Sequence, residues 1–320
     1  MTSQKTAIIT GVSGQDGLYL SKFLLEKNYR VIGTVRSVSS LNKKNFNYLG
    51  VLDKIIIKEI DLLDITNIIN LIRDYNPHEI YNLAAQSSVG LSFNQPIGTF
   101  TFNTASVNNL LESIRLFKPD TKFYQASSSE MFGNVKQLPI NIDTPKHPVS
   151  PYAVSKTAAH YMVSIYRDSY GIFASNGILF NHESFLRGNN FFIKKIITSA
   201  IAIKNNELSE LKVGNLNVKR DFGFAPKYVE VMWKMLQVDT PQDFIICSGE
   251  SLYLSDIIYY VFDKLKLDKK LIVQDEKLIR PNEIKDIYGD NSLAKKELNW
   301  NYDLSFFNVL DILIEEQLKV

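Results

Sequence analysis

The chain has 320 residues, 45% of them hydrophobic and 22% charged, a composition typical of a globular protein with a large core. Its 36 basic and 34 acidic side chains leave a formal net charge of +2, which argues against a strongly charged surface for nucleic acid or membranes. The single cysteine, Cys247, excludes an intramolecular disulfide framework and a Cys-rich zinc site, and no apolar run reaches the ~18 residues of a membrane helix. We expect a cytoplasmic protein without a metal site.

Short apolar strands and amphipathic helices alternate through the first half of the chain. Strands are predicted at residues 5–10, 30–35, 54–60, 79–84, 122–125 and 174–180, and helices at 17–28, 64–75, 103–117 and 151–170. Continuous apolar strands separated by helices are typical of a doubly wound parallel sheet of the Rossmann type, an α/β fold.

After residue 180 this alternation breaks down. Helices are predicted at 191–204, 256–266 and 306–318, with short extended segments at 212–214 and 271–274. We expect a dinucleotide-binding domain at 1–180, joined by part of 215–250. The rest of 181–320 is expected to form a smaller, partly discontinuous α/β substrate-binding domain.

A glycine-rich turn, Gly11-Val-Ser-Gly14-Gln-Asp-Gly17, separates the first strand from the first helix. Such a turn occurs in many α/β proteins. In this position it favours dinucleotide binding, because glycines let a pyrophosphate approach the backbone N–H groups at the helix N-terminus. Arg36 then follows the second strand where an NAD enzyme often has a carboxylate. With Ser37 and Ser39 beside it, Arg36 suits a 2′-phosphate and favours NADP over NAD.

Tyr152 and Lys156 lie four residues apart on the predicted long helix, so their side chains share one face. A lysine ammonium beside a phenol lowers the pKa of the phenol from ~10, which makes tyrosine a base for a sugar hydroxyl. A second pair with this spacing, Tyr260 and Lys264, has no upstream partner and is interpreted as chance. Upstream of the first pair, Ser127-Ser128-Ser129-Glu130 follows a strand at its carboxyl end, where open α/β sheets bind ligands.

These motifs carry a resemblance to the extended short-chain dehydrogenase/reductases and, within them, to the GDP-mannose 4,6-dehydratase family. The matching stretches span most of the chain: residues 10–17 (TGVSGQDG), 81–87 (YNLAAQS), 123–130 (FYQASSSE), 150–156 (SPYAVSK), 176–184 (NGILFNHES), 220–223 (RDFG) and 280–281 (RP). The QDG turn and the FNHES run are more specific than the Rossmann glycines.

The resemblance implies a role for each matching residue. Ser128 falls on the family's catalytic Ser or Thr, which hydrogen-bonds the substrate O4, and Glu130 falls on the dehydratase glutamate. Tyr152 and Lys156 fall on the catalytic base and its partner. The implied cofactor positions are Gly11, Val12, Ser13, Gly14, Gln15, Asp16, Arg36, Asp61, Leu62, Leu83, Ala84, Ala85, Gln86, Ser87, Lys156, His182 and Arg187. The implied GDP-sugar positions are Asn181, Lys195, Arg220, Arg280 and Glu283.

The chain also departs from the family. Ser37 stands where a second arginine is common, and the loop from there to Asp61 is shorter. A tyrosine usual near Gly98 is missing. The resemblance implies a homodimer, with the helices at 103–117 and 151–170 in a four-helix interface, or a homotetramer built around the shortened loop.

The resemblance implies a nucleotide-sugar 4,6-dehydratase that converts GDP-mannose to GDP-4-keto-6-deoxymannose with an internally recycled NADP. A GDP-4-keto-sugar reductase or a C4 epimerase or oxidoreductase is an alternative on the same scaffold, and such enzymes do not need Glu130. A dehydratase for another GDP-sugar, such as GDP-manno-heptose, also fits, because Phe185-Leu186 replaces the family's Pro-Arg. A dinucleotide-sensing regulatory protein is the non-enzyme alternative, against which the intact catalytic set argues.

Overall fold

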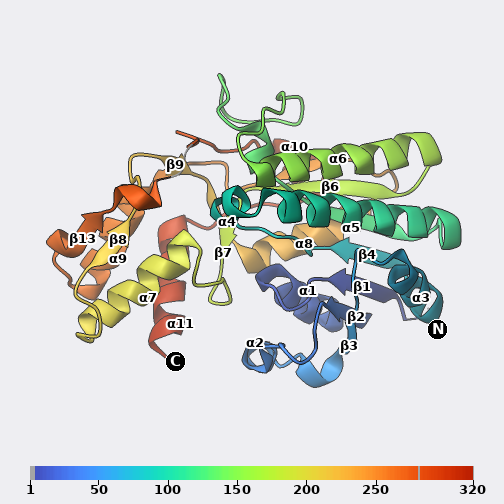
Figure 1. Cartoon of the computed structure of the whole chain (residues 1–320), viewed down its shortest axis with the longest axis horizontal. Helices are drawn as coiled ribbons and strands as arrows, with labels where there is room; N and C mark the ends of the chain where they lie inside the picture. Colours follow the sequence, from blue (N-terminus) through green and yellow to red (C-terminus); the bar gives the residue numbers. More distant parts are fainter. Residues whose placement is uncertain (1–3, 280–281, 320) are drawn as a thin grey trace.

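A seven-stranded sheet organises the larger part of the protein. The computed structural model describes residues 4–279 and 282–319. All seven strands are parallel, in the order β11-β6-β5-β4-β1-β2-β3 (Figure 1). In chain order they are β1 (Thr6–Thr10), β2 (Arg30–Val35), β3 (Ile56–Glu59), β4 (Glu79–Asn82), β5 (Lys122–Ser128), β6 (Ala174–Leu179) and β11 (Phe244–Ile246). This confirms the predicted Rossmann sheet, whose strand order reverses between β1 and β4, at the position where such sheets bind ligands.

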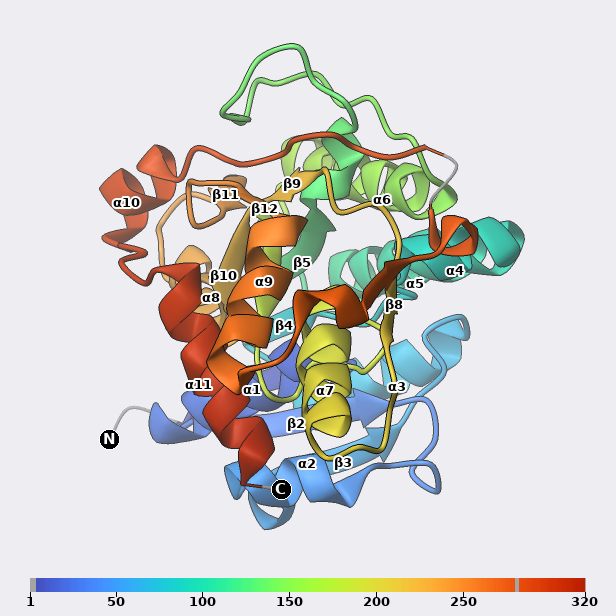
Figure 2. The same cartoon turned by 90° about the vertical axis from the view of Figure 1, so that its left-hand side faces the viewer.

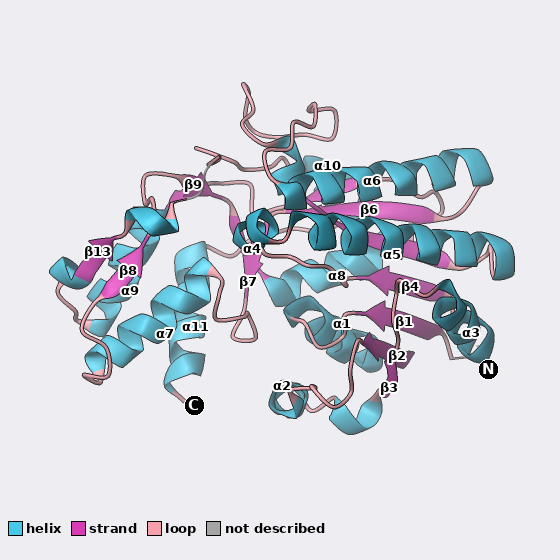
Figure 3. Cartoon of the chain, in the orientation of Figure 1, coloured by secondary structure: helices cyan, strands magenta, loops and turns pink. Residues whose placement is uncertain are grey.

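Helices cover both faces of this sheet (Figure 3). One face carries α3 (Ile65–Tyr75), α5 (Pro96–Phe117) and α6 (Pro151–Tyr170), and the other carries α1 (Gln15–Glu26), α8 (Ala225–Met235) and α10 (Ser292–Leu298). The strand side chains alternate between two cores: Ile8 packs with α3 and α5, whereas Ala7 and Ile9 pack with α1 and α8. Burial on both faces explains why the strands are continuously apolar.

The C-terminal part has its own hydrophobic cluster, which lies beyond the carboxyl ends of the strands (Figure 2). It is built from α7 (Phe192–Lys204), β8 (Leu211–Val213), α9 (Leu254–Leu265), β13 (Ile272–Gln274) and α11 (Phe306–Leu318). Two small pairings connect this part to the main sheet: β7 (Asn181–Glu183) with β10 (Phe222–Phe224), and β9 (Lys219–Arg220) with β12 (Leu252–Tyr253).

The structure adds elements that the sequence pattern did not predict. They include the helices α2 (Lys43–Leu49), α4 (Val89–Asn94), α8 and α10 and the short strands β7, β9, β10, β11 and β12. α5 begins at Pro96 rather than at residue 103. Proline is favoured in the first helical turn, and Gly98, Thr99 and Thr101 lower the helix propensity of the part that was not predicted. The prediction omitted β11 because it is only three residues long and its pairing with β6 is a long-range contact. No helix in the described residues is long and apolar enough to cross a membrane.

Candidate functional site

The glycine-rich turn forms a cradle between β1 and α1. Gly11 adopts φ +67°, and a Cβ at this position would lie 2.9 Å from Ala84 Cα. A Cβ on Gly17 would lie 2.6 Å from Gly11 O. Gly14 is the N-cap of α1, and no described side chain caps the helix there. The first N–H groups of α1 are therefore placed to receive an anion such as a pyrophosphate, which fits a dinucleotide.

Several predicted cofactor residues contribute to this cradle through their backbones. Val12 is buried, and its N–H donates to Thr34 O at 3.2 Å, whereas Ser13 is exposed. Across the switch point, the N–H groups of Leu83 and Ala84 donate to Thr10 Oγ1 at 3.1 and 3.2 Å. The predicted loop therefore lies directly beside the glycine turn.

The remainder of the 83–87 loop is held by α5. Gln86 N–H donates to Asn103 Oδ1 at 2.8 Å, and its side-chain amide donates to Thr99 Oγ1 at 3.0 Å. Ala85 is partly buried and Ser87 is exposed. Asn103 also donates to Ser155 Oγ on α6 at 3.0 Å, so it joins the loop to the helix that carries the candidate base.

Gln15, Asp16 and His182 link α1 to β7. The Gln15 side chain donates to His182 O at 3.1 Å, and His182 Nε2 lies 2.9 Å from an Asp16 oxygen. Burial raises the pKa of Asp16, but the charge and hydrogen bond of His182 outweigh it and hold the pKa below its ordinary value. Burial lowers the pKa of His182, but the charge and hydrogen bond of Asp16 outweigh burial and hold this pKa above its ordinary value. The His182 ring also stacks on Tyr228, with 4.6 Å between centroids.

Arg36 stands exposed just after β2, at the edge of the cradle. Beside it, the hydroxyls of Ser37 and Ser39 lie 2.9 Å apart. Asp61, also exposed, accepts a hydrogen bond from Leu63 N–H at 2.9 Å, while Leu62 is buried. These positions follow the ends of β2 and β3, as the sequence predicts for the adenosine side of a dinucleotide site.

Arg187 follows β7 and pairs with the buried Glu183 at 3.5 Å. Its guanidinium also lies over the Phe191 ring, 3.6 Å from the centroid. Nearby, Phe185 packs against Tyr48 from α2, with 4.8 Å between ring centroids, and Lys194 Nζ lies 4.1 Å from the Phe185 centroid. Phe185, one of the two residues that replace the family's Pro-Arg, is therefore packed against α2 in the segment after β2.

The candidate catalytic side chains meet at the carboxyl end of β5. Ser128 Oγ accepts a hydrogen bond from Glu130 N–H at 3.3 Å. Lys156 Nζ donates to Ala126 O at 2.8 Å. Tyr152 is the second residue of α6, after the Ser150 N-cap and Pro151, and Ser128 and Glu130 both influence its pKa. The structure thus brings the four predicted catalytic residues together.

The predicted lowering of the Tyr152 pKa by Lys156 is wrong. Burial raises the pKa of Tyr152 to about 12, and the hydrogen bond to Ser128 opposes this without reversing it. Burial also lowers the pKa of Lys156 to about 8. The physical reason is that both groups are desolvated and the ammonium is directed to Ala126 O, with Nζ 5.9 Å from the Tyr152 ring centroid.

Three of the predicted substrate residues converge near β9 and β10. Asn181 Nδ2 donates to Asp221 O at 3.2 Å, and the buried Arg220 donates to Ile284 O at 2.7 Å, next to Glu283. Lys195 lies on α7 and donates to Lys212 O of β8 at 2.8 Å. Arg280 lies outside the described residues.

Asp221 was not predicted as a functional residue, yet it organises this region. Its carboxylate accepts hydrogen bonds from Ser248 N–H and Oγ at 2.8 and 2.7 Å and from Gly249 N–H at 3.1 Å. Gly289 N–H lies 3.4 Å from its second oxygen. Asp221 therefore joins three segments far apart in sequence, and its place in the 220–223 stretch, beside Arg220, was the available signal.

The second Tyr-Lys pair, Tyr260 and Lys264, makes contacts that join two helices. Tyr260 hydroxyl and Lys264 Nζ donate to opposite oxygens of Asp311 at 2.8 and 2.9 Å, which joins α9 to α11. This agrees with its interpretation as a chance match.

The fold and the site together define a Rossmann-type protein of the short-chain dehydrogenase/reductase class. A family profile described as GDP-mannose 4,6 dehydratase matches residues 8–313, and the chain belongs to this family. GDP-mannose 4,6 dehydratase 2 of Arabidopsis thaliana is 40% identical over 328 residues, covering 99% of this chain and 88% of the relative.

Solved structures share the fold. DesIV, a dTDP-glucose 4,6-dehydratase from Streptomyces venezuelae with NAD and TYD bound, superposes with a TM-score of 0.89 at 18% identity, covering 98% of this chain and 97% of that one. RMD from Pseudomonas aeruginosa complexed with NADPH superposes with a TM-score of 0.83 at 22% identity, covering 99% of each chain.

Proposed function

We propose that this protein is a nucleotide-sugar 4,6-dehydratase that converts GDP-mannose to GDP-4-keto-6-deoxymannose. The observation that carries the proposal is the convergence of Ser128, Glu130, Tyr152 and Lys156 at one edge of the sheet. A reductase or an epimerase needs a base and its partner but no catalytic carboxylate. Glu130 and membership of the family therefore favour the dehydratase over both rivals.

The proposed cofactor is a nicotinamide dinucleotide, NADP rather than NAD. The glycine cradle and the uncapped N-terminus of α1 fit its pyrophosphate. Arg36 supports NADP, because it is exposed at the end of β2 and can pair with a 2′-phosphate. A nicotinamide held there would supply a hydride acceptor for C4 of the sugar and a hydride donor for C6, so the overall reaction would be redox-neutral.

The chain's own residues then carry the proton transfers. Tyr152 removes the proton from O4 while Ser128 hydrogen-bonds that oxygen, and Lys156 lies on the same face of α6, held by Ala126 O. The C4 ketone acidifies the C5–H bond. Glu130 takes the C5 proton and passes it to the C6 hydroxyl, which leaves as water, and C5 then takes a proton from solvent as hydride is added at C6. A ketone at C4 and a methyl at C6 result.

The GDP portion is proposed to lie against the C-terminal part, on Asn181, Lys195, Arg220 and Glu283. Arginine suits a pyrophosphate because its guanidinium donates in a fork. This assigns residues 1–180 and part of 215–250 to the cofactor and the rest of 181–320 to the substrate. The contribution of β11 and α8 to the main sheet and its cover supports that division.

A homodimer is proposed through α5 and α6, which pack against each other. Their outer side carries exposed apolar residues, among them Ile97 at 81% exposure, Phe100, Val154, Tyr161 and Ile165. Such a surface on adjacent helices is typical of a subunit contact. Sedimentation should give twice the mass of one chain, or four times for a tetramer, and Ile165→Asp should shift it toward the monomer.

The direct test is incubation with GDP-mannose and NADP, followed by mass spectrometry. The expected product has lost one water. With substrate deuterated at C4, the deuterium should reappear at C6, with one solvent proton at C5. A product that keeps its C6 hydroxyl would indicate a C4 oxidoreductase instead. A parallel panel of other GDP-sugars tests the choice of sugar.

Glu130→Gln isolates the second half of the reaction. The variant keeps the size of the side chain but loses the base, so it should bind the sugar and oxidise C4 without releasing a dehydrated product. Nicotinamide fluorescence should rise and remain high. Normal dehydration by this variant would show that Glu130 is not the C5 base.

A further inference from the structure

A third residue continues the catalytic face of α6. His160 follows Lys156 by four residues, as Lys156 follows Tyr152, so all three lie on one side of the helix. This side faces three consecutive residues at the end of β5. Tyr152 interacts with Ser128, Lys156 donates to Ala126 O, and His160 Nδ1 lies 3.3 Å from Ser127 Oγ.

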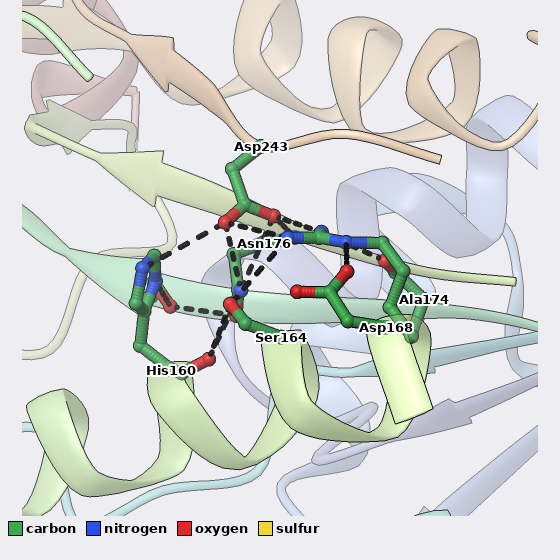
Figure 4. A network of polar contacts seen from close by, with 8 residues as sticks. His160, Ser164, Asp168, Ala174, Asn176 and Asp243 are labelled. Atoms are coloured by element: carbon green, nitrogen blue, oxygen red, sulfur yellow. Dashed lines mark hydrogen bonds and ion pairs between the residues drawn. The ribbon is translucent and has the colours of Figure 1, made fainter. Parts of the chain in front are cut away.

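Behind His160, a buried carboxylate anchors the helix to two further strands (Figure 4). Asp243, directly before β11, accepts a hydrogen bond from Arg167 of α6 at 2.6 Å. It also accepts from the backbone N–H of Asn176 on β6 at 2.9 Å and from the Asn176 side-chain amide at 3.2 Å. His160 Nε2 lies 3.7 Å from the same carboxylate. The network therefore spans α6, β5, β6 and β11.

The hydrogen-bond directions in this network follow from its acceptors. Asn176 Nδ2 donates to His160 O and to Asp243, so its Oδ1 must face the Ser127 hydroxyl, 3.2 Å away. Ser127 has a single hydroxyl hydrogen, which this oxygen accepts. His160 then satisfies Ser127 Oγ as a donor, through a protonated Nδ1. In this arrangement Ser127 Oγ, Asn176 Oδ1 and His160 Nδ1 each have a hydrogen-bond partner.

The side chains resemble a nucleophilic Ser-His-Asp set, but their environment excludes that role. Ser127 and His160 are each only 3% exposed, and the Asp243 side chain is 10% exposed. No substrate reaches Ser127. Burial lowers the pKa of His160 to about 4, with Asp243 opposing and Lys146 and Arg167 reinforcing the shift, so the ring stays neutral at physiological pH. A neutral, buried donor holds a position rather than carrying a proton.

We propose that His160 is a positioning residue. Through its contact with Ser127 it fixes the position of α6 relative to β5, and so places Tyr152 and Lys156 relative to Ser128. The proposal rests on the proposed function for its kinetic consequences. Ser127 directly precedes Ser128, so a change in the contact between His160 and Ser127 displaces the Ser128 hydroxyl relative to the Tyr152 phenol. Misplacement by ~1 Å costs up to ~10²-fold in rate.

The test compares two replacements of His160. Asn places its amide nitrogen near the position of Nδ1 and can still donate to Ser127, whereas Phe keeps the ring but has no donor. His160→Phe should lower kcat by ~10- to 100-fold with KM for GDP-mannose within about twofold, and His160→Asn should restore most of the lost rate. The matched control is Ser164→Ala, which removes a 3.3 Å hydrogen bond to His160 O on the same network. It should leave kcat and the Tyr152 environment unchanged.

A substrate-free readout separates this proposal from the proposed function. In tyrosine-labelled protein, the ¹³Cζ resonance of Tyr152, identified by its loss in Tyr152→Phe, should shift in His160→Phe and Ser127→Ala and keep its position in His160→Asn. If the wild type fails to dehydrate GDP-mannose, the proposed function is wrong, and this resonance still decides the role of His160. An unchanged resonance in both His160→Phe and Ser127→Ala, or a wild-type kcat in His160→Phe, would overturn the positioning role.

Discussion

Asp221 offers a quantitative test of how burial and hydrogen bonding compete in this protein. It is fully buried, and four donors from Ser248, Gly249 and Gly289 face its two oxygens. Burial nevertheless raises its pKa from 3.8 to about 6. In Asp221→Asn one oxygen becomes an amide nitrogen, so the two donors that faced it lose their acceptor. This destabilises the fold by about 1–3 kcal/mol for each lost partner.

The sign of the pH dependence follows from the raised pKa. Between pH 3.8 and 6 the folded chain binds a proton at Asp221 that the unfolded chain has lost, so the free energy of unfolding falls as the pH rises. The full effect is about 3 kcal/mol, of which about 1.4 kcal/mol falls between pH 5 and pH 8. Asn does not titrate. The stability deficit of Asp221→Asn should therefore be about 1.4 kcal/mol smaller at pH 8 than at pH 5.

Urea unfolding of both proteins at pH 5, 6, 7 and 8 measures this deficit directly. The ionisable neighbours Tyr228, Cys247 and Tyr302 have pKa values raised by burial, so they stay neutral over this range and cancel in the difference. Ser248→Ala keeps the carboxylate but removes one donor, so its titration should persist and move to higher pH. A deficit that is constant from pH 5 to pH 8 would refute the argument.

Three further substitutions test the site. Gly17→Ala places a Cβ 2.6 Å from Gly11 O and should lower the free energy of unfolding by about 1–3 kcal/mol in urea titrations, whereas Gly90→Ala meets no atom within 4 Å and should not be destabilising. Arg36→Ala should weaken NADP, measured by calorimetry, about 10-fold or more and NAD much less, because a hydrogen bond between charged groups contributes about 1.5–3 kcal/mol. An equal loss for both cofactors contradicts that role. Tyr152→Phe should lower kcat by ~10²–10⁴-fold with GDP-mannose binding retained, and Tyr260→Phe should not.

The sequence alone was sufficient to predict the parallel sheet and the glycine cradle. Both depend on short-range chemistry: continuous apolar runs form strands buried on two faces, and a glycine-rich turn at a strand end permits a positive φ at Gly11. The convergence of Ser128, Glu130, Tyr152 and Lys156 also followed, because the carboxyl ends of parallel strands share one edge and residues four apart share one helix face.

Only the tertiary structure decided what surrounds these residues. Asp243 reaches His160 because β11, separated from β6 in sequence by the C-terminal elements, returns to pair with it. Lys156 bonds to Ala126 O, and burial moves the pKa of Tyr152 in the opposite direction from the predicted one. Hydrogen-bond partners and desolvation depend on contacts between distant segments, and no local pattern in the sequence records those contacts.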